Sequence, residues 1–119
     1  MPTEAPKLAS KAPSTTNSSL RTLAREIARE HGLNEEEFLR VLDCENRGWD
    51  PSIQSYHRYK EGNRWGFPAG TREKSYGLVM IHLPDHPSVT YEQATDPVYA
   101  LNWMADKWVQ GRQAMWSCY

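Results

Sequence analysis

The sequence contains no long run of apolar residues. A helix that crosses a bilayer needs about 20 mostly apolar residues, and no stretch of these 119 residues approaches that length. The N-terminus also lacks the apolar segment of a secretory signal peptide. We therefore expect no membrane span and no export signal in this chain, so that any export is encoded elsewhere.

The chain has no excess of positive charge. Its 14 lysines and arginines are balanced by 15 aspartates and glutamates. A nucleic-acid-binding domain of this size usually carries a basic surface that attracts phosphates. We therefore expect no nucleic acid among its partners.

Cysteine is scarce. Only Cys44 and Cys118 are present, and two isolated cysteines lack the spacing of a zinc site. A disulfide between them would close a long loop and contribute about 4 kcal/mol by the loop-entropy relation. Two buried free thiols are the alternative, and the sequence does not decide between the two.

The motifs of several kinds of catalysis are missing as well. The chain has no Ser-His-Asp order, no glycine-rich phosphate loop and no paired CxxC motif. His82, Asp85 and His86 are residue types that bind metals, but Pro84 and Pro87 interrupt the helix that would bring the two histidines onto one face. We expect no metal and no cofactor.

Tryptophan, in contrast, is abundant. Five tryptophans exceed what one small core needs, and sugar-binding clefts use additional ones because the flat rings match the C–H faces of pyranosides. Trp103 and Trp108 lie in one helical segment, where Trp108 shares the core-facing stripe. Trp49, Trp65 and Trp116 are the candidates for a carbohydrate cleft.

The chain divides into a tail and one domain. Residues 1–17 are rich in Pro, Ala, Ser, Thr and Lys, a composition that buries too little apolar surface to order itself. We expect a disordered tail or linker there and a domain over residues 18–119. With 39% apolar residues the chain is large enough for one compact core and too short for two.

Two helices are indicated near the ends of this domain by apolar residues at helical spacing. The first has Ser18 or Ser19 as its N-cap and stops at Gly32. The second begins after Asp96, which is followed by a proline at the first helical position, and continues to Gly111.

A further helix lies between them. Asn34 is followed by three glutamates, which suit the positive end of a helix and form a capping-box pattern. The helix should end at Glu45 or Asn46, because Gly48 and Pro51 prevent its continuation.

The middle of the chain has no helical period. Residues 55–74 hold three glycines, a proline and scattered aromatics, which indicates a long loop or a small irregular hairpin. The apolar run SYGLVMIHLP that follows, residues 75–84, is expected to form a buried turn of helix. The sequence therefore predicts a mainly helical single domain, α or α+β, with a loop or small hairpin inserted in its middle.

Glu45 stands where the apolar helical pattern gives way to turn residues. A carboxylic acid donates a proton near neutral pH most readily in apolar surroundings, because these penalise its charged form. Leu42, Cys44 and Trp49 could supply such surroundings. Helix ends also often carry solvated glutamates, so position alone does not distinguish an active-site acid from a surface residue.

Several short motifs occur around and after this glutamate in a characteristic order. Over residues 20–119 the chain resembles the soluble lytic transglycosylases, lysozyme-like enzymes that cleave peptidoglycan and are related to goose-type lysozymes. The segments that carry the resemblance are Glu45-Asn46, Trp49-Asp50-Pro51, Ser55, Ser75-Tyr76-Gly77-Leu78-Val79-Met80-Ile81 and Trp116-Ser117-Cys118-Tyr119.

The resemblance implies an α+β lysozyme-like fold for residues 18–119 and a single catalytic acid, Glu45. It places Ser55 near this acid and makes Tyr119 the tyrosine of the last family motif. The residues then expected to bind substrate are Trp49, Ser55, Trp65, Ser75, Tyr76, Gly77, Met80, Trp116 and Tyr119.

The activity implied is cleavage of the β-1,4 bond between N-acetylmuramic acid and N-acetylglucosamine, with a 1,6-anhydro product. The partner would be the glycan strand of peptidoglycan, the enzyme a monomer, and its location the periplasm, the cell wall or the extracellular space, in a bacterial or phage context.

The chain departs from the family pattern at three places. Asn46 stands where the family has serine, and both are short side chains that bond nearby backbone. Met80 stands where the family has glutamine, which removes an amide that would contact substrate or orient Glu45. The chain ends at Tyr119 where the family continues, and residues 55–75 are longer than in the larger enzymes.

Two other functions stay open. A lysozyme-type hydrolase needs a second carboxylate to activate water, and Glu73 or Asp50 could provide it. The ordinary roles of these two residues are surface charge balance and turn formation, respectively. A binding module that retains the cleft without turnover is the other alternative.

Overall fold

The computed structural model describes residues 16–119. The expected tail over residues 1–17 falls almost entirely outside this range. The described part is mainly helical, as the sequence predicted, with a two-stranded hairpin and a long loop between the second and third helices. Among these residues, no helix has the length and apolar character that crossing a membrane requires.

Helix α1, Asn17–Glu30, begins earlier than predicted. Its N-cap is Thr16, whose hydroxyl oxygen accepts a hydrogen bond from the backbone N–H of Ser19, so the prediction of Ser18 or Ser19 as the cap was wrong. The first buried residue of the helix is Leu20. Apolar periodicity cannot detect the exposed polar turn that precedes it.

Helix α2, Glu35–Glu45, has the predicted bounds. Asn34 caps it by accepting a hydrogen bond from the backbone N–H of Glu37 at 2.9 Å. Helix α4, Pro97–Val109, also agrees with the prediction, with Asp96 as its N-cap. A short helix α3, Tyr91–Ala94, and a final 3-10 turn η3, Gln113–Met115, were not predicted.

The apolar run after residue 74 is a hairpin, so the expected turn of helix was wrong. Strands β1, Ser75–Tyr76, and β2, Ile81–His82, pair antiparallel and lead into the 3-10 turn η2, Leu83–Asp85. The tight turn between the strands depends on Gly77, which has φ 87° and lies so close to helix α3 that an added Cβ would stand 1.9 Å from the carbonyl oxygen of Ala94. Met80 follows in the same turn with φ 55°.

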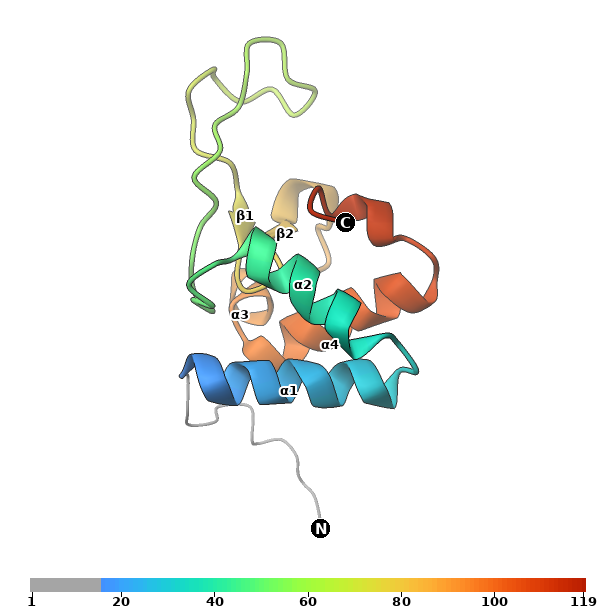
Figure 1. Cartoon of the computed structure of the whole chain (residues 1–119). Helices are drawn as coiled ribbons and strands as arrows, with labels where there is room; N and C mark the ends of the chain where they lie inside the picture. Colours follow the sequence, from blue (N-terminus) through green and yellow to red (C-terminus); the bar gives the residue numbers. More distant parts are fainter. Residues whose placement is uncertain (1–15) are drawn as a thin grey trace.

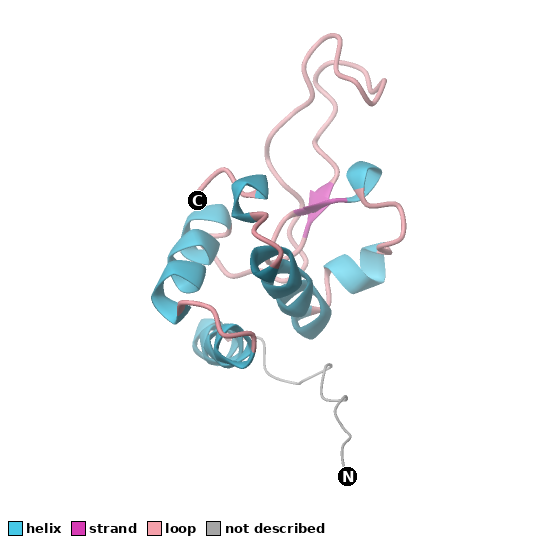
Figure 2. Ribbon diagram, turned by 90° about the vertical axis from the view of Figure 1, so that its right-hand side faces the viewer, coloured by secondary structure: helices cyan, strands magenta, loops and turns pink. Residues whose placement is uncertain are grey.

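The core lies between three helices and the hairpin. Helix α1 runs beneath α2 and α4 and contacts both (Figures 1 and 2). The side chains fully buried among these elements are Phe38, Val41, Leu42, Leu78, Val79, Ile81, Leu101 and Met104. This packing fixes the end of α2 against the hairpin and the C-terminal segment.

Residues 55–74 form a long loop that projects from the body on the side opposite α1 (Figure 1). Its two limbs are joined by an isolated bridge between Arg58 and Arg72. Tyr59 is buried at 5% exposure and stacks on Phe67 with ring centroids 4.8 Å apart. The loop thus has a small aromatic core of its own, and its base adjoins β1.

Candidate active site

Glu45 is the last residue of helix α2, and the side chain of Asn46 determines where this helix stops. The Asn46 amide donates to the carbonyl of Asp50 at 2.9 Å and accepts from the backbone N–H of the same residue at 3.2 Å. This reciprocal pair closes a turn over residues 46–50. The chain therefore leaves the helical direction directly after Glu45.

Trp49 supports this turn from inside the protein. Its φ is 52°, its side chain is 2% exposed, and its indole N–H donates to Asp43 at 2.8 Å while the guanidinium of Arg21 lies 5.1 Å above its ring. The hydrogen bond from Arg21, aided by the one from Trp49, lowers the pKa of Asp43. Trp49 therefore lies in the core, and the structure does not bring it into a cleft as the sequence suggested.

The C-terminal segment is joined to the end of α2 by a disulfide. Cys44 and Cys118 are bonded, with Cα atoms 6.0 Å apart, so the alternative of two free thiols was wrong. The bond places the last residues beside Glu45, whose Oε2 accepts from the backbone N–H of Cys118 at 2.9 Å and from the hydroxyl of Ser117 at 3.3 Å. Among residues 16–119 no hydrogen bond is made to the other carboxylate oxygen.

Glu45 lines a cleft of about 520 Å³. One part of its wall is aromatic or apolar, and another part carries carboxylates and imidazoles. The lining residues are Glu45, Ser55, Tyr56, His57, Trp65, Glu73, Ser75, Met80, His82, Asp85, Met115, Trp116 and Ser117. Leu42, expected beside Glu45, lies in the core instead.

Glu73 and the two buried serines lie together at the base of the loop. The hydroxyl of Ser75 donates to Glu73 at 3.1 Å, and the hydroxyl of Ser55 accepts from the backbone N–H of His57 at 3.1 Å. The backbones of the two serines are bonded directly, N–H of Ser55 to carbonyl of Ser75, at 2.8 Å. The serines therefore hold the loop to β1, while the Glu73 carboxylate shares the cleft with Glu45.

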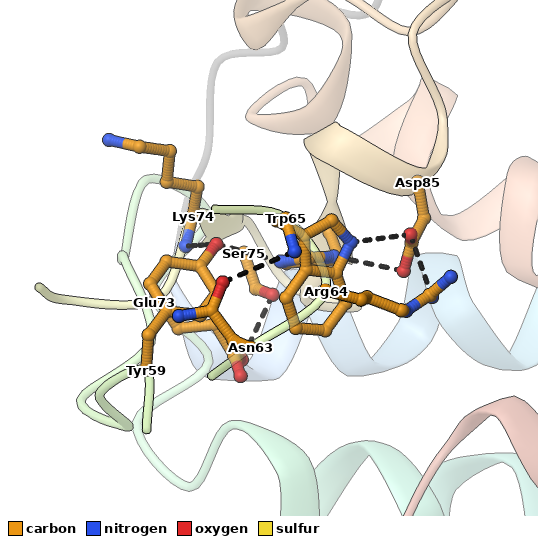
Figure 3. Close-up of polar contacts among 9 residues, drawn as sticks. Tyr59, Asn63, Arg64, Trp65, Glu73, Lys74, Ser75 and Asp85 are labelled. Carbon is orange, nitrogen blue, oxygen red and sulfur yellow. Dashed lines mark hydrogen bonds and ion pairs between the residues drawn. The ribbon is translucent and has the colours of Figure 1, made fainter. Parts of the chain in front are cut away.

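Another part of the cleft wall is held by Asp85 of η2. Trp65 donates its indole N–H to Asp85 at 2.8 Å, Arg64 forms an ion pair with it at 2.9 Å, and His82 Nδ1 lies 3.0 Å from it (Figure 3). Burial opposes ionisation of Asp85, but the hydrogen bonds from Trp65 and His82 outweigh it and lower the pKa. These contacts fasten the tip of the loop to η2.

Tyr59 completes this network from inside the loop. Its hydroxyl lies 2.8 Å from Nε2 of His82 and accepts from the backbone N–H of Lys74 at 3.1 Å (Figure 3). Burial raises its pKa. His82 and Asp85 thus serve a structural network, and no group of three or more His, Cys, Asp or Glu side chains in the described range is arranged to hold a metal ion.

Trp116 and Met80 lie in the cleft wall as expected from the sequence. The indole N–H of Trp116 donates to the carbonyl of Val79 at 2.8 Å, which ties the C-terminal segment to the hairpin turn. Met80, in the left-handed turn conformation, lines the same cleft as Trp116 and Glu45.

Three other predicted residues lie outside the cleft lining. The ring of Tyr76 packs edge-on against Tyr91, and Gly77 is buried against α3. Tyr119 is 52% exposed and packs against Trp108 with ring centroids 5.4 Å apart. In this last motif it is Ser117 and Cys118 that donate hydrogen bonds to Glu45.

Sequence reasoning missed part of the lining. Ser117 precedes Cys118, so the disulfide pairing was the signal that could have placed it beside Glu45. Tyr56 and His57 come from the irregular loop and Met115 from a single 3-10 turn, and no periodic pattern marks which way such residues face.

No family model matches this chain, and no curated protein or solved structure matches it either. The family resemblance seen in the sequence adds the choice of substrate.

Proposed function

We propose that this chain is a peptidoglycan-cleaving glycosidase in which Glu45 is the general acid that protonates the glycosidic oxygen between two sugars. The observation that supports it best is the placement of Glu45, which lines a cleft while a backbone N–H fixes one of its carboxylate oxygens at 2.9 Å. Trp65 and Trp116 in the same wall suit the C–H faces of sugar rings. A carboxyl group and aromatic surfaces in one groove are the elements that a glycosidase needs.

The first step is transfer of a proton. Protonated Glu45 donates to the glycosidic oxygen between N-acetylmuramic acid and N-acetylglucosamine, the bond from this oxygen to C1 breaks, and positive charge develops at C1 of the muramoyl ring. Cys118 N–H and Ser117 then stabilise the carboxylate that remains.

The second step defines a lytic transglycosylase. Glu45, now ionised, takes the proton of the muramoyl C6 hydroxyl, and the C6 oxygen forms a bond to C1 while the N-acetyl group of the substrate stabilises the positive centre. The product is a 1,6-anhydro sugar, no water is consumed, and Glu45 is again protonated. One carboxylate suffices because the nucleophile belongs to the substrate.

A lysozyme-type hydrolase is the second candidate, and one observation favours it. Glu73 lines the same cleft as Glu45 and accepts a hydrogen bond from Ser75. A carboxylate on the far side of the substrate could activate water for attack at C1. Asp50 does not line the cleft, so it is not retained for this role.

Mass spectrometry of the soluble products tests the proposal. Purified peptidoglycan treated with wild-type protein should release muropeptides with 1,6-anhydro ends, each lighter by one water than the ends that hydrolysis leaves. The Glu45→Gln variant should release none. Hydrated ends that disappear in Glu73→Gln would favour the hydrolase, and binding to peptidoglycan without any release would favour a binding module.

The disulfide supports a location outside the cytoplasm. Disulfides persist in the periplasm and in extracellular spaces, where thiols are not kept reduced. A wall-cleaving enzyme whose active site is tied by Cys44–Cys118 suits the periplasm, the cell wall or the extracellular space.

A further inference from the structure

A smaller hollow of about 240 Å³ adjoins the main cleft behind Met80 and Trp116. Its far wall is formed by His86, which follows η2, and by Trp103 of helix α4. The rings of these two residues meet edge to face with centroids 4.8 Å apart, and Trp103 meets Trp116 in the same way at 5.9 Å. A substituent on a sugar in the cleft would enter this hollow between aromatic walls.

His86 offers polar atoms there. Neither ring nitrogen makes a hydrogen bond within residues 16–119, although the side chain is partly buried. Burial, with a contribution from the positive charge of Lys107, lowers the pKa of the imidazole. The neutral ring carries one N–H donor that is available to an anionic or carbonyl group.

Near the hollow, the positive side chains have no ion-pair partner among the described residues, whereas the negative side chain has one. Lys107 lies with its ammonium 5.2 Å from the centre of the Trp103 ring, and Lys107 and Arg112 both act electrostatically on His86. Neither cation has an ion-pair partner in the described part of the chain. The carboxylate of Asp85, which also lines the hollow, is already engaged by Arg64, Trp65 and His82.

Such an arrangement favours an anion, because the cations are unpaired while the carboxylate is neutralised. In the main cleft the balance is opposite, since the carboxylates of Glu45 and Glu73 face the same space. A ligand that fits both regions is neutral along its sugar backbone and carries a negative group on a side branch.

We propose that this hollow is a subsite for a carboxylate on the branch that muramic acid carries at C3. The inference rests on the proposed function for the choice of a glycan strand. The carboxylate has two possible sources, the stem peptide of intact peptidoglycan and the lactyl group that becomes free when the peptide is removed. His86 supplies the donor and Trp103 the wall, while Lys107 and Arg112 contribute positive charge from outside the lining of the hollow.

A binding titration that needs no catalysis tests the subsite. Muramyl dipeptide is added to the Glu45→Gln protein while the indole N–H signals of Trp103 and Trp116 and the ring signals of His86 are followed by NMR. We expect the Trp103 and His86 signals to shift with muramyl dipeptide and not with chitobiose, which should shift Trp116 alone because, of the two tryptophans, only that one also lines the main cleft. The Lys107→Gln/Arg112→Gln exchange should weaken binding of muramyl dipeptide about fivefold. The same exchange of charge at Arg47 and Lys60, which line neither cavity and are not among the charges that act on His86, should leave it unchanged.

Cleavage assays separate the two sources of the carboxylate. Preference for intact peptidoglycan that is lost in Lys107→Gln/Arg112→Gln supports the stem peptide, and preference for strands freed of peptide by an amidase supports the lactyl group. Equal binding of both muramyl dipeptide and N-acetylmuramic acid by this variant and wild type, or cleavage of all substrates at unchanged relative rates, overturns the subsite even where the enzyme is active. Shifts of the His86 and Trp103 signals without any cleavage would overturn the enzyme and retain the subsite.

Discussion

The backbone N–H of Cys118 donates to Oε2 of Glu45 across 2.9 Å, and the side chain of the same cysteine is bonded to Cys44, the neighbour of that glutamate. The covalent link and the hydrogen bond therefore act on one helix end. Residues separated by 74 positions in the chain meet at the proposed catalytic acid.

Removing the disulfide should affect both stability and activity. The Cys44→Ser/Cys118→Ser variant should lose about 4 kcal/mol of unfolding free energy by the loop-entropy relation, measured by urea denaturation. Because the segment that bonds Glu45 is released, the turnover rate of still-folded protein should also fall. Unchanged turnover in this variant at a temperature where it is folded would show that the segment does not position Glu45.

Gly77 should tolerate no side chain. In Gly77→Ala the new Cβ would collide with the carbonyl oxygen of Ala94, and the backbone would be held at φ 87°. We therefore expect the free energy of unfolding, measured by thermal denaturation, to fall by about 3 kcal/mol or more. Gly62→Ala is the matched control, since its φ is 76° but nothing lies within 4 Å of the added Cβ. It should lose about 1 kcal/mol from backbone strain alone. Equal losses in the two variants would contradict the close approach of the hairpin turn to α3.

The ion pair between Arg21 and Asp43 predicts a dependence of stability on pH. The pKa of Asp43 is lower in the folded protein than in the unfolded chain, chiefly because of the hydrogen bond from Arg21. Its contribution is therefore present above the unfolded pKa of about 3.9 and is lost as the pH falls through the folded pKa. Melting temperatures of wild type and Asp43→Asn should differ at pH 7 and converge in strong acid. A difference that stays constant with pH would contradict this account.

Loss of the Asp85 contacts should weaken substrate binding more than it destabilises the hydrophobic core. Asp85→Ala removes the acceptor of Trp65 and the partner of Arg64, so the loop tip should detach from η2 and KM should rise about tenfold, with a smaller effect on kcat. Glu61→Gln, an exposed change in the same loop, is the control and should leave KM unchanged. A fall in kcat at constant KM would instead place Asp85 in the chemical step.

The sequence was most informative where structure is local. The end of α2 at Glu45 could be predicted because an apolar helical stripe stops and a proline follows within a few residues. The hairpin of residues 75–82 could not, because each of its strands is only two residues long, which is too short to show an alternating pattern. Trp49 was expected in a cleft because tryptophan suits sugars. The left-handed backbone conformation at this residue instead directs its indole to Asp43. A single left-handed residue leaves no periodic pattern in the sequence from which it could be predicted.

The contacts of the cleft were predicted least well for the same reason. Tyr119 was expected to bind substrate, but its ring packs on Trp108 and its side chain makes no hydrogen bond to Glu45. The preceding two residues make the contact because the disulfide fixes Cys118 at the helix end. The pairing of distant cysteines contributes to this register, together with the hydrogen bond from Trp116 to Val79, and the sequence left that pairing open.

The most direct test of the central claim is the muropeptide mass spectrum from wild-type protein and Glu45→Gln, with circular dichroism to show that both are folded. We predict 1,6-anhydro muropeptides from the wild type and none from the variant, whose amide cannot donate the proton. Release of the same products by folded Glu45→Gln at the wild-type rate would contradict the role of this carboxylate.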